Sequence, residues 1–459
     1  MENQEYSVGL DIGTTKIVAI VGRRNAHGKI EILGVGKAKS LGVHKGIVNN
    51  ISQTINSIKA AVSEAQSSAG VPIHKVTVGI AGKHIRSLQH SDYIMREHPD
   101  RFITDDDIEA LKDQVKKLVM LPGEEIIHVL PQEYKVDSEG EIQEPVGMHG
   151  KRLEANFHVV VGQMGSIRNI ARCVREAGLE MEALTLEPLA SSEAVLTKEE
   201  KEAGVAIVDI GGGTTDIAIF KDNIIRHTCV IPYGGGIITE DIKEGCSIIE
   251  KHAEQLKVKF GSAVPELEKD STFVTIPGLH GRPDKEISLK TLAQIINARV
   301  EEILEMVNTE LKAYGAFEQK KKLIAGIVLT GGGSNLKHLR QLANYTTGFD
   351  SRIGFANEYI ANDKNQYLKG PEFATSIGLL MESLKIRDKK TVAVEEEVEI
   401  EVDAKVEQKE VQTDINAETQ VAPQIEEEFK APVQTSRTSK PTFGQSLMEK
   451  VKKFFEEVE

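Results

Sequence analysis

Two stretches of the chain share one pattern of hydrophobic and polar positions. In each, an apolar run leads to an aspartate, a turn of glycine and threonine follows, and a second apolar run continues, over residues 6–21 and 205–220. Apolar runs of this length around a tight turn predict a β-hairpin. Because the two copies lie far apart in the chain, they indicate two similar lobes rather than the stacked short repeats of a solenoid.

Apolar strands and amphipathic helices follow each predicted hairpin. Hydrophobic residues recur at helical spacing over residues 51–66 and 289–314, among shorter apolar runs that are typical of buried strands. An alternation of strands and helices is the pattern of layered α/β domains. We therefore predict an α/β fold of two lobes.

Residues 84–163, called the insert below, interrupt this alternation. Thr104 and the three aspartates after it predict the start of a helix, and strand-like runs follow at 125–129 and 157–161. We expect a small α+β subdomain that binds other proteins and carries no chemistry. Its histidines show no metal-ligand spacing and are expected to be surface or core residues; they are His90, His98, His128, His149 and His158.

The pattern changes again towards the C-terminus. Residues 388–441 are acidic and contain one aromatic residue, Phe429, so too little apolar surface is available to offset the entropy of folding. We predict a disordered linker there, with a strand over 394–411 as the alternative. Residues 442–459 predict an amphipathic helix that inserts shallowly into a lipid surface, or else docks in a protein groove. Its apolar face consists of Phe443, Leu447, Val451, Phe454, Phe455 and Val458.

Composition narrows the classes of function. The 459 residues carry a formal net charge of −14, which argues against a general nucleic-acid binder. The three cysteines are widely separated, so the sequence predicts neither a disulfide scaffold nor a zinc ribbon, and fits a reducing compartment. We find no signal peptide and no apolar run near the ~18–20 residues of a membrane span. These features predict a cytoplasmic protein.

The hairpin turns carry the residues for a nucleotide site. Backbone N–H groups in a glycine-rich turn form a nest for phosphate, and an adjacent aspartate can hold Mg²⁺ through water. Two such hairpins facing each other would hold a triphosphate from both sides, with Asp11 and Asp209 toward the metal. No P-loop signature occurs. The predicted cofactor-binding residues of these turns are Gly13, Thr14, Thr15, Lys16, Gly211, Gly212, Gly213, Thr214 and Thr215, of which Gly13, Thr14, Thr15, Gly212, Gly213 and Thr214 are expected toward the phosphates.

A third glycine-rich turn follows the apolar run at 327–330. Glycines at this point allow the backbone to approach a flat ligand such as adenine or ribose, although a plain strand-to-helix turn would have the same composition. The residues of this turn are Gly331, Gly332, Gly333 and Ser334.

These motifs together resemble the actin/Hsp70/sugar-kinase ATPase superfamily. Residues 187–192 and 374–380 are similar to its two connecting motifs, and the resemblance implies that ATP and Mg²⁺ bind in the cleft. It also implies that Glu187 orients the attacking water; a helix N-terminal carboxylate is the alternative. Glu254 and Lys257 resemble the pair that contacts ribose and adenine, with a surface ion pair as the alternative.

Within that superfamily the insert resembles subdomain 1C of the FtsA family of bacterial cell-division proteins. The similar strings lie at 103–108, 127–137 and 145–154. The resemblance implies a protein with at most slow ATPase activity that polymerises on the cytoplasmic face of the inner membrane at the division septum. Its implied partners are FtsZ, which it tethers, further copies of itself, the membrane lipid surface, and other division proteins that bind subdomain 1C.

The alternative function is a small-molecule kinase of the same fold, acting on a sugar-type substrate. An Hsp70-type chaperone is a third candidate, but a folded substrate domain would have to follow the ATPase. The predicted boundaries are first-lobe segments at 1–83 and 164–203, the insert at 84–163, the second lobe at 204–387, the linker at 388–441 and the amphipathic helix at 442–459.

Overall fold

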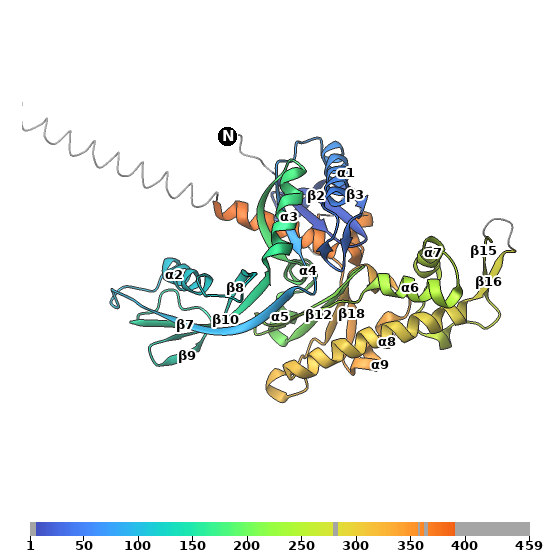
Figure 1. Ribbon diagram of the computed structural model, residues 1–459. Coiled ribbons are helices and arrows are strands. Elements are labelled where there is room, and N and C mark those ends of the chain that lie inside the picture. Colours follow the sequence, from blue (N-terminus) through green and yellow to red (C-terminus); the bar gives the residue numbers. More distant parts are fainter. Residues whose placement is uncertain (1–5, 279–282, 357–358, 362–365, 391–459) are drawn as a thin grey trace, which may run out of the picture. The chain divides into compact units, whose positions relative to one another are not determined.

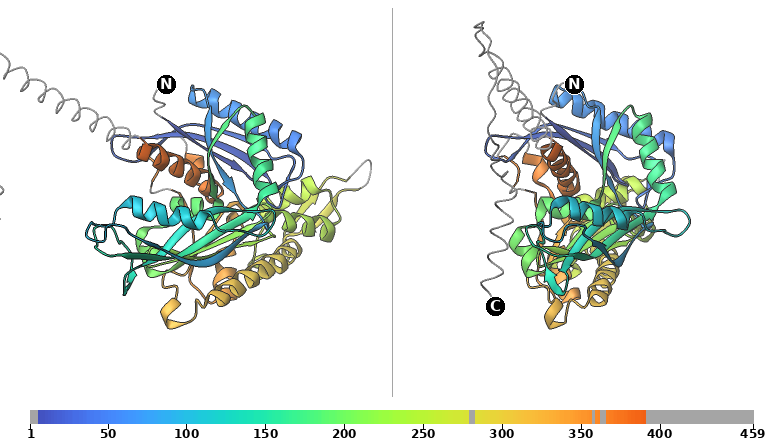
Figure 2. Two further views of the ribbon diagram at one scale, coloured as in Figure 1. Left: turned by 60° about the vertical axis from the view of Figure 1, so that its left-hand side comes forward. Right: turned by 90° about the vertical axis from the view of Figure 1, so that its left-hand side faces the viewer.

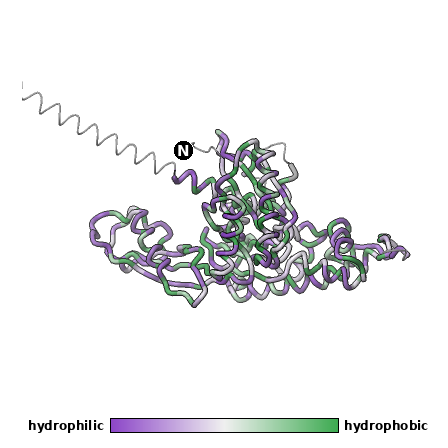
Figure 3. Tube along the Cα trace, turned by 45° about the horizontal axis from the view of Figure 1, so that its top comes forward, coloured by the Kyte–Doolittle hydropathy of each residue, from purple (hydrophilic) through white to green (hydrophobic). Residues whose placement is uncertain are grey.

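The computed structural model describes residues 6–278, 283–356, 359–361 and 366–390 (Figure 1). This part of the chain includes the whole insert and most of both lobes, and the residues of the predicted linker after 390 and of the C-terminal helix lie outside it. Within the described residues, no helix has the length and apolar character needed to cross a membrane. In Figure 3, hydrophobic residues gather inside each lobe and hydrophilic residues follow the outer helices and loops.

The first lobe is built on a sheet with strand order β11-β6-β1-β2-β3. Its first hairpin is the predicted one, with Asp11 of β1 opposite Val18 of β2. Successive β2 residues point to opposite faces, so Ile17 lies in the core beneath α1 and α3, whereas Val18 faces the second lobe. The elements are β1 (Ser7–Ile12), β2 (Lys16–Arg24), β3 (Ile30–Lys39), β4 (Val43–His44), β5 (Ile47–Val48), α1 (Ile51–Ala69), β6 (Lys75–Ile80), α3 (Met164–Glu176), β11 (Glu180–Leu186), α4 (Glu187–Val195) and α5 (Lys198–Ala203).

The second lobe repeats this plan with strand order β14-β13-β12-β17-β18. Its hairpin places Asp209 of β12 opposite Asp216 of β13. The long helix α8 buries its apolar face, including Ile296 and Leu304, against this sheet and the neighbouring helices. The elements are β12 (Val205–Ile210), β13 (Thr215–Lys221), β14 (Ile224–Ile231), α6 (Gly235–Cys246), α7 (Glu250–Phe260), β15 (Phe273–Ile276), β16 (Lys285–Ser288), α8 (Leu289–Tyr314), β17 (Ile327–Thr330), α9 (Leu339–Thr347) and β18 (Ser351–Ile353).

A shared core lies between the two sheets. A helix over residues 374–390 contributes Ile377 and Leu380 to it, α4 contributes Ala194, and the lobes contribute Ile20 and Ile207. Residues 388–390, assigned to the linker from composition, belong to this helix. Asp388 accepts a hydrogen bond from Arg24 over 2.8 Å, and Lys390 pairs with Glu182 over 2.8 Å, so both side chains tie the last described turn to the first lobe.

The insert forms its own sheet, in the order β7-β10-β8-β9, with α2 against one face (Figure 2). Phe157, Leu153 and Leu111 are fully buried in a core between sheet and helix. Thr104 and Asp107 form a capping box at the start of α2, as the sequence pattern predicts. The elements are β7 (Ile85–Met95), α2 (Asp105–Lys116), β8 (Glu124–Val136), β9 (Glu139–Ile142) and β10 (Arg152–Gln163).

Candidate functional site

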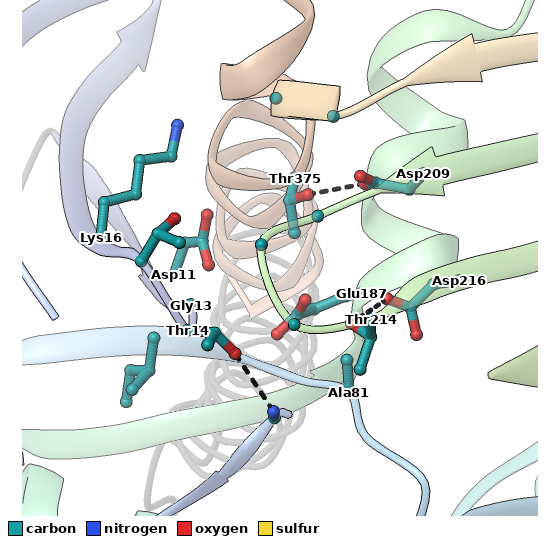
Figure 4. Close-up of a pocket in the computed structure, with 18 of the residues that line it drawn as sticks. Asp11, Gly13, Thr14, Lys16, Ala81, Glu187, Asp209, Thr214, Asp216 and Thr375 are labelled. Atoms are coloured by element: carbon teal, nitrogen blue, oxygen red, sulfur yellow. Dashed lines mark hydrogen bonds between the residues drawn. The ribbon is translucent and has the colours of Figure 1, made fainter. Parts of the chain in front are cut away.

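The two hairpin turns meet at a cleft of about 640 Å³, open solvent included (Figure 4). Carboxylates, hydroxyls and glycine backbone line it from both lobes. The lining residues are Asp11, Ile12, Gly13, Thr14, Thr15, Lys16, Gly46, Ala81, Glu187, Asp209, Gly211, Gly212, Gly213, Thr214, Asp216, Gly331, Gly332, Glu372 and Thr375.

The first hairpin supplies an aspartate and a hydroxyl-rich turn. Asp11 lies next to the last residue of β1 and is 7 % exposed, and its Oδ2 accepts a hydrogen bond from Ser376 Oγ over 2.9 Å. Thr14 Oγ1 accepts from the N–H of Gly46 over 3.3 Å, which ties the turn to the tip of the β4–β5 hairpin. The turn is therefore fixed from two sides before any ligand binds.

The second hairpin approaches the first closely. A Cβ added at Gly213 would lie 2.5 Å from Thr14 Oγ1, and one added at Gly212 would lie 2.4 Å from Thr15 Cγ2. Only glycine fits at both positions, because any side chain would push the hairpins apart. The N–H of Gly235, in the first turn of α6, donates to the Gly211 carbonyl over 2.8 Å. The start of α6 is thereby joined to this turn.

Hydrogen bonds fix the Asp209 carboxylate, as they do that of Asp11. Its Oδ2 accepts hydrogen bonds from Ser191 Oγ over 2.6 Å and Thr375 Oγ1 over 3.0 Å, so α4 and the helix over 374–390 both orient it (Figure 4). Gly331 has a φ of 80°, and a Cβ there would lie 2.2 Å from Asp209 Oδ1. A side chain at that position would displace the carboxylate.

Four of the acidic side chains that line the cleft have raised pKa values. Burial raises the pKa of Asp11 and of Asp209, and burial together with the charge of Asp209 raises the pKa of Asp216 to about 8. Burial, followed by the charges of the three aspartates, raises the pKa of Glu187 well above its ordinary value. The cleft thus lacks enough positive charge to hold all four groups ionised at low cost.

Lys16 is one of the predicted cofactor-binding residues, and the structure places it at the cleft. Its Nζ donates to the carbonyl of Glu372 and lies 4.4 Å from the centre of the Phe373 ring. Burial lowers the pKa of this lysine, while the charge of Asp11 raises it in part. The ammonium is therefore poorly solvated and would gain from an anionic ligand.

Glu187 is the first residue of α4 and points into the space between the hairpins (Figure 4). Its side chain packs over the backbone of β6, where a Cβ added at Gly79 would lie 3.0 Å from Glu187 Cγ. Its position fits the predicted water-orienting role. The alternative, a carboxylate that only stabilises the helix N-terminus, predicts the same location.

Some predicted residues lie behind the cleft wall rather than on it. Thr215 Oγ1 donates to the Tyr233 carbonyl over 2.8 Å, and Ser334 Oγ donates to the Gly331 carbonyl over 2.7 Å. Gly333 packs on Ile210, with an added Cβ only 2.4 Å from Cγ2. These residues therefore shape the two turns, and Gly331 and Gly332 form the exposed part of the third glycine motif.

Glu254 and Lys257 form an ion pair of 2.7 Å on α7 that is only partly at the surface, with the lysine side chain 12 % exposed. Lys257 Nζ also donates to the carbonyl of Gly235 and to Thr239 Oγ1, each over 2.7 Å. The pair thus braces the first turn of α6 and is not among the residues that line the described cleft.

Sequence reasoning missed several lining residues: Ile12, Gly46, Ala81, Asp216, Glu372 and Thr375. A signal existed for Asp216, because a charged residue inside the apolar run of a buried strand is costly unless it has a function. Thr375 lies within the second connecting motif. Nothing in the local sequence distinguishes Gly46 or Ala81, which reach the cleft only through the course of the chain.

The acidic cluster fits a magnesium ion held mainly through water. Asp216 Oδ1 is buried without a hydrogen-bond partner in the described structure, although Oδ2 accepts from Thr214 Oγ1 over 2.8 Å. Among the described residues, no three acidic, histidine or cysteine side chains are arranged to hold a metal directly. Asp216 Oδ1 could accept a hydrogen bond from a water of a hydrated cation, since magnesium keeps most of its waters.

Family models match both the second lobe and the insert. A model of the family described as Cell division protein FtsA matches residues 206–378, and a model of the SHS2 domain inserted in FtsA matches residues 82–161, which correspond to the insert. In the PilM-PilN type IV pilus biogenesis complex, a chain 17% identical superposes with a TM-score of 0.60, covering 82% of this chain and 98% of that one. That similarity concerns the fold alone.

Sequence relatives identify the family. The cell division protein FtsA of Pseudomonas aeruginosa is 41% identical over 386 residues, which cover 84% of this chain and 91% of that protein. The protein of the same name from Neisseria meningitidis is 37% identical over 385 residues, covering 84% and 92%. Both predictions from the motifs, the two-lobed actin-like fold and the family, are confirmed. The chain belongs to the FtsA family of actin-like cell-division proteins.

Proposed function

We propose that the cleft binds Mg²⁺–ATP and that the bound nucleotide controls assembly of this cell-division protein on the membrane. The observation that carries this proposal is the meeting of two glycine–threonine turns over buried carboxylates. Backbone N–H groups of both turns are suited to the phosphates, with Asp11, Asp209 and Asp216 toward a hydrated magnesium ion. Gly331 and Gly332 would face the adenosine. When bound, magnesium supplies the positive charge that the acidic cluster and the phosphates need.

The kinase alternative is not favoured. The relatives that match most of the chain are cell-division proteins, and the insert matches the SHS2 domain inserted in FtsA. Hydrolysis is expected to be slow, because the raised pKa of Glu187, the candidate for orienting water, favours its protonated form.

Nucleotide titration tests the site directly. Asp209→Ala should abolish magnesium-dependent ATP binding, since the ion would lose one anchor of its hydration shell while the phosphates keep their charge. Asp270→Ala is the matched control, because Asp270 is an exposed aspartate of the same lobe with a side chain 80 % exposed. Equal affinity of wild type and Asp209→Ala would refute this placement of the metal.

The remaining proposals concern partners and location. We propose that the protein forms filaments, binds FtsZ and, through the insert, other division proteins, at the cytoplasmic face of the inner membrane at the septum. The helix predicted at 442–459 would be its membrane anchor. Co-sedimentation with lipid vesicles and ATP, with and without FtsZ, tests these proposals together. If FtsZ stays in solution when the protein sediments, the tethering role is wrong.

The anchor has its own test in vesicle flotation. Phe454→Glu combined with Phe455→Glu should leave the protein in solution, because two charges would enter the predicted apolar face. Phe429→Glu, in the predicted linker, is the control and should still float. Wild-type binding should fall only mildly with salt, because glutamates offset the lysines of this helix. Flotation of the double variant would exclude the anchor.

A further inference from the structure

The insert contacts the second lobe as well as the first, from which its chain emerges. Gln132 Nε2 donates to the Ile225 carbonyl of β14 over 2.6 Å, and Glu133 forms an ion pair of 2.6 Å with Arg226 of the same strand. β14 pairs with β13, the strand that carries Asp216 into the cleft. The insert therefore contacts the strand that pairs directly with the strand carrying Asp216.

His158 makes a further polar link to β14. This histidine is 1 % exposed, and its Nε2 lies 2.9 Å from Thr228 Oγ1. Gln89 Nε2 lies 3.3 Å from His158 Nδ1 and 3.5 Å from the Arg226 carbonyl, so the amide donates to both acceptors. The imidazole must then carry its proton on Nε2 and donate to Thr228.

His128 makes the corresponding link to the first lobe. Its Nε2 accepts a hydrogen bond of 3.0 Å from the backbone N–H of Leu186. Leu186 is 1 % exposed and is the N-cap residue of α4, so the next residue is Glu187. A side chain of the insert is thus bonded to the backbone unit that precedes the carboxylate in the cleft.

Two β-bulges in β8 orient the side chains that make these contacts. The pairing of β8 with β10 slips at Ile127, directly before His128, and again at Gln132. A bulge re-aims the side chains beside it and is frequent next to functional sites. Ile127 packs against the core of the first lobe, whereas Gln132 contacts the second. Each bulge therefore lies where β8 contacts one of the lobes, as expected if the strand is shaped to contact both.

Glu187 needs such support. Within the described part of the chain, no side chain donates a hydrogen bond to its carboxylate, and repulsion from Asp11, Asp209 and Asp216 acts on it. Its direction therefore depends on packing over Gly79 and on the backbone at Leu186. Burial lowers the pKa of His128 to about 4, so the ring is neutral at neutral pH. Because the N–H of Leu186 donates to Nε2, the single ring proton is on Nδ1.

We infer that His128 is a positioning residue for Glu187, and that through it the insert senses the state of the nucleotide cleft. The second half of this inference rests on the proposed nucleotide binding; the first half does not. A move of Glu187 on binding would pull on the Leu186–His128 hydrogen bond, while a move of the second lobe would act on the insert through β14. The insert is then a responsive domain and not only a docking surface.

Hydrogen exchange on the full chain tests both halves. In His128→Leu the Leu186 amide should exchange about fivefold faster or more, the factor for one lost hydrogen bond. His128→Gln places an amide oxygen near the same position and should restore the protection. His98→Leu is the matched control, because His98 is an exposed histidine of the insert. With Mg²⁺–ATP, wild type should show changed exchange in β8 and β10. The change next to His128 should be lost in His128→Leu, and ATP affinity should stay within about twofold.

Each outcome decides a separate point. Unchanged Leu186 exchange in His128→Leu, or a Gln variant that behaves like the Leu variant, overturns the positioning role. Absent ATP binding by wild type refutes the proposed function and with it the sensing, while the exchange measured without nucleotide still decides the positioning role. ATP binding with no change in β8 and β10 overturns the sensing alone. Should His128→Leu not fold, ¹⁵N chemical shifts of histidine in wild type decide: a proton on His128 Nε2 excludes the hydrogen bond.

Discussion

Replacing Asp216 by asparagine should stabilise the nucleotide-free protein while weakening its response to Mg²⁺–ATP. Asp216 is 3 % exposed at the centre of the acidic cluster, and burial together with the charge of Asp209 raises its pKa from 3.8 to about 8. Asparagine keeps an oxygen for the hydrogen bond from Thr214 Oγ1 and removes the ionisable group. The substitution therefore isolates the cost of burying this carboxyl group.

The size and sign of the effect follow from that pKa. A carboxyl group whose pKa is higher in the folded than in the unfolded protein contributes stability below pH 3.8 that is lost as the pH rises toward 8. At pH 7 the folded protein keeps a proton that the unfolded chain releases, which costs about 4 kcal/mol at 1.36 kcal/mol per pH unit. The free energy of unfolding of Asp216→Asn should thus exceed that of wild type by up to about 4 kcal/mol at pH 7, and by little near pH 4.

Thermal melts between pH 4 and 8, with and without Mg²⁺–ATP, measure both effects. Without ligand the variant should melt several degrees higher at pH 7, and the difference should shrink as the pH falls. With ligand at 100 times the wild-type Kd, wild type should gain about 2.7 kcal/mol, and the variant less, since a group facing the metal is lost. The control is Glu266→Gln, which removes an exposed carboxylate of the same lobe. A variant that is less stable at pH 7, or a difference independent of pH, would refute the reasoning.

Three further predictions follow from the same geometry. Gly213→Ala should lower ATP affinity about tenfold or more in a nucleotide titration, because its Cβ would lie 2.5 Å from Thr14 Oγ1 and separate the hairpins; unchanged affinity would contradict their close approach in solution. Glu187→Gln should slow phosphate release without weakening ATP binding, and equal release rates would remove its water-orienting role. Burial lowers the pKa of His158 to about 4, so between pH 6.5 and 4 the unfolded chain binds a proton that the folded protein does not. As the pH falls through this range, the free energy of unfolding of wild type should decrease by up to about 3 kcal/mol relative to that of His158→Gln. Urea melts in which the two proteins change with pH in parallel would contradict this.

The elements with strong local signals could be predicted from the sequence. The helical pattern at 289–314 agrees with α8 at both ends, and α1 ends three residues later than predicted, where Gly70 adopts a φ of 70° as its C-cap. The strand predicted at 125–129 covers only part of β8, because Pro131 is a poor strand residue. The structure accommodates it beside the bulge at Gln132, where the ladder is already irregular. Tertiary pairing with β10 thus overrides the local signal.

The cleft residues likewise fall into those that a local motif predicts and those that only the tertiary structure brings to the site. The hairpin turns bring Asp11 and Asp209 to the site, and both were found because each motif is local and repeated. Gly46 and Ala81 reach it only because the chain returns past the first turn, which no local pattern encodes. His128 was expected to be an ordinary surface or core residue, because its role depends on a bulge and on the N–H of a residue far away in the sequence.

The placement of the shared core explains how a small ligand could alter the whole protein. Glu187 lies on α4 and Thr375 on the helix over 374–390, and both helices are packed between the two sheets. Interiors are close-packed, so this core must repack if one lobe moves relative to the other. Neutralising the acidic cluster with a hydrated cation removes repulsion between carboxylates of both lobes and therefore favours closure. The insert is hydrogen-bonded to β14 and to the backbone at Leu186. Closure of the lobes would therefore act on both contacts at once. A domain that responds in this way could signal the nucleotide state to a partner.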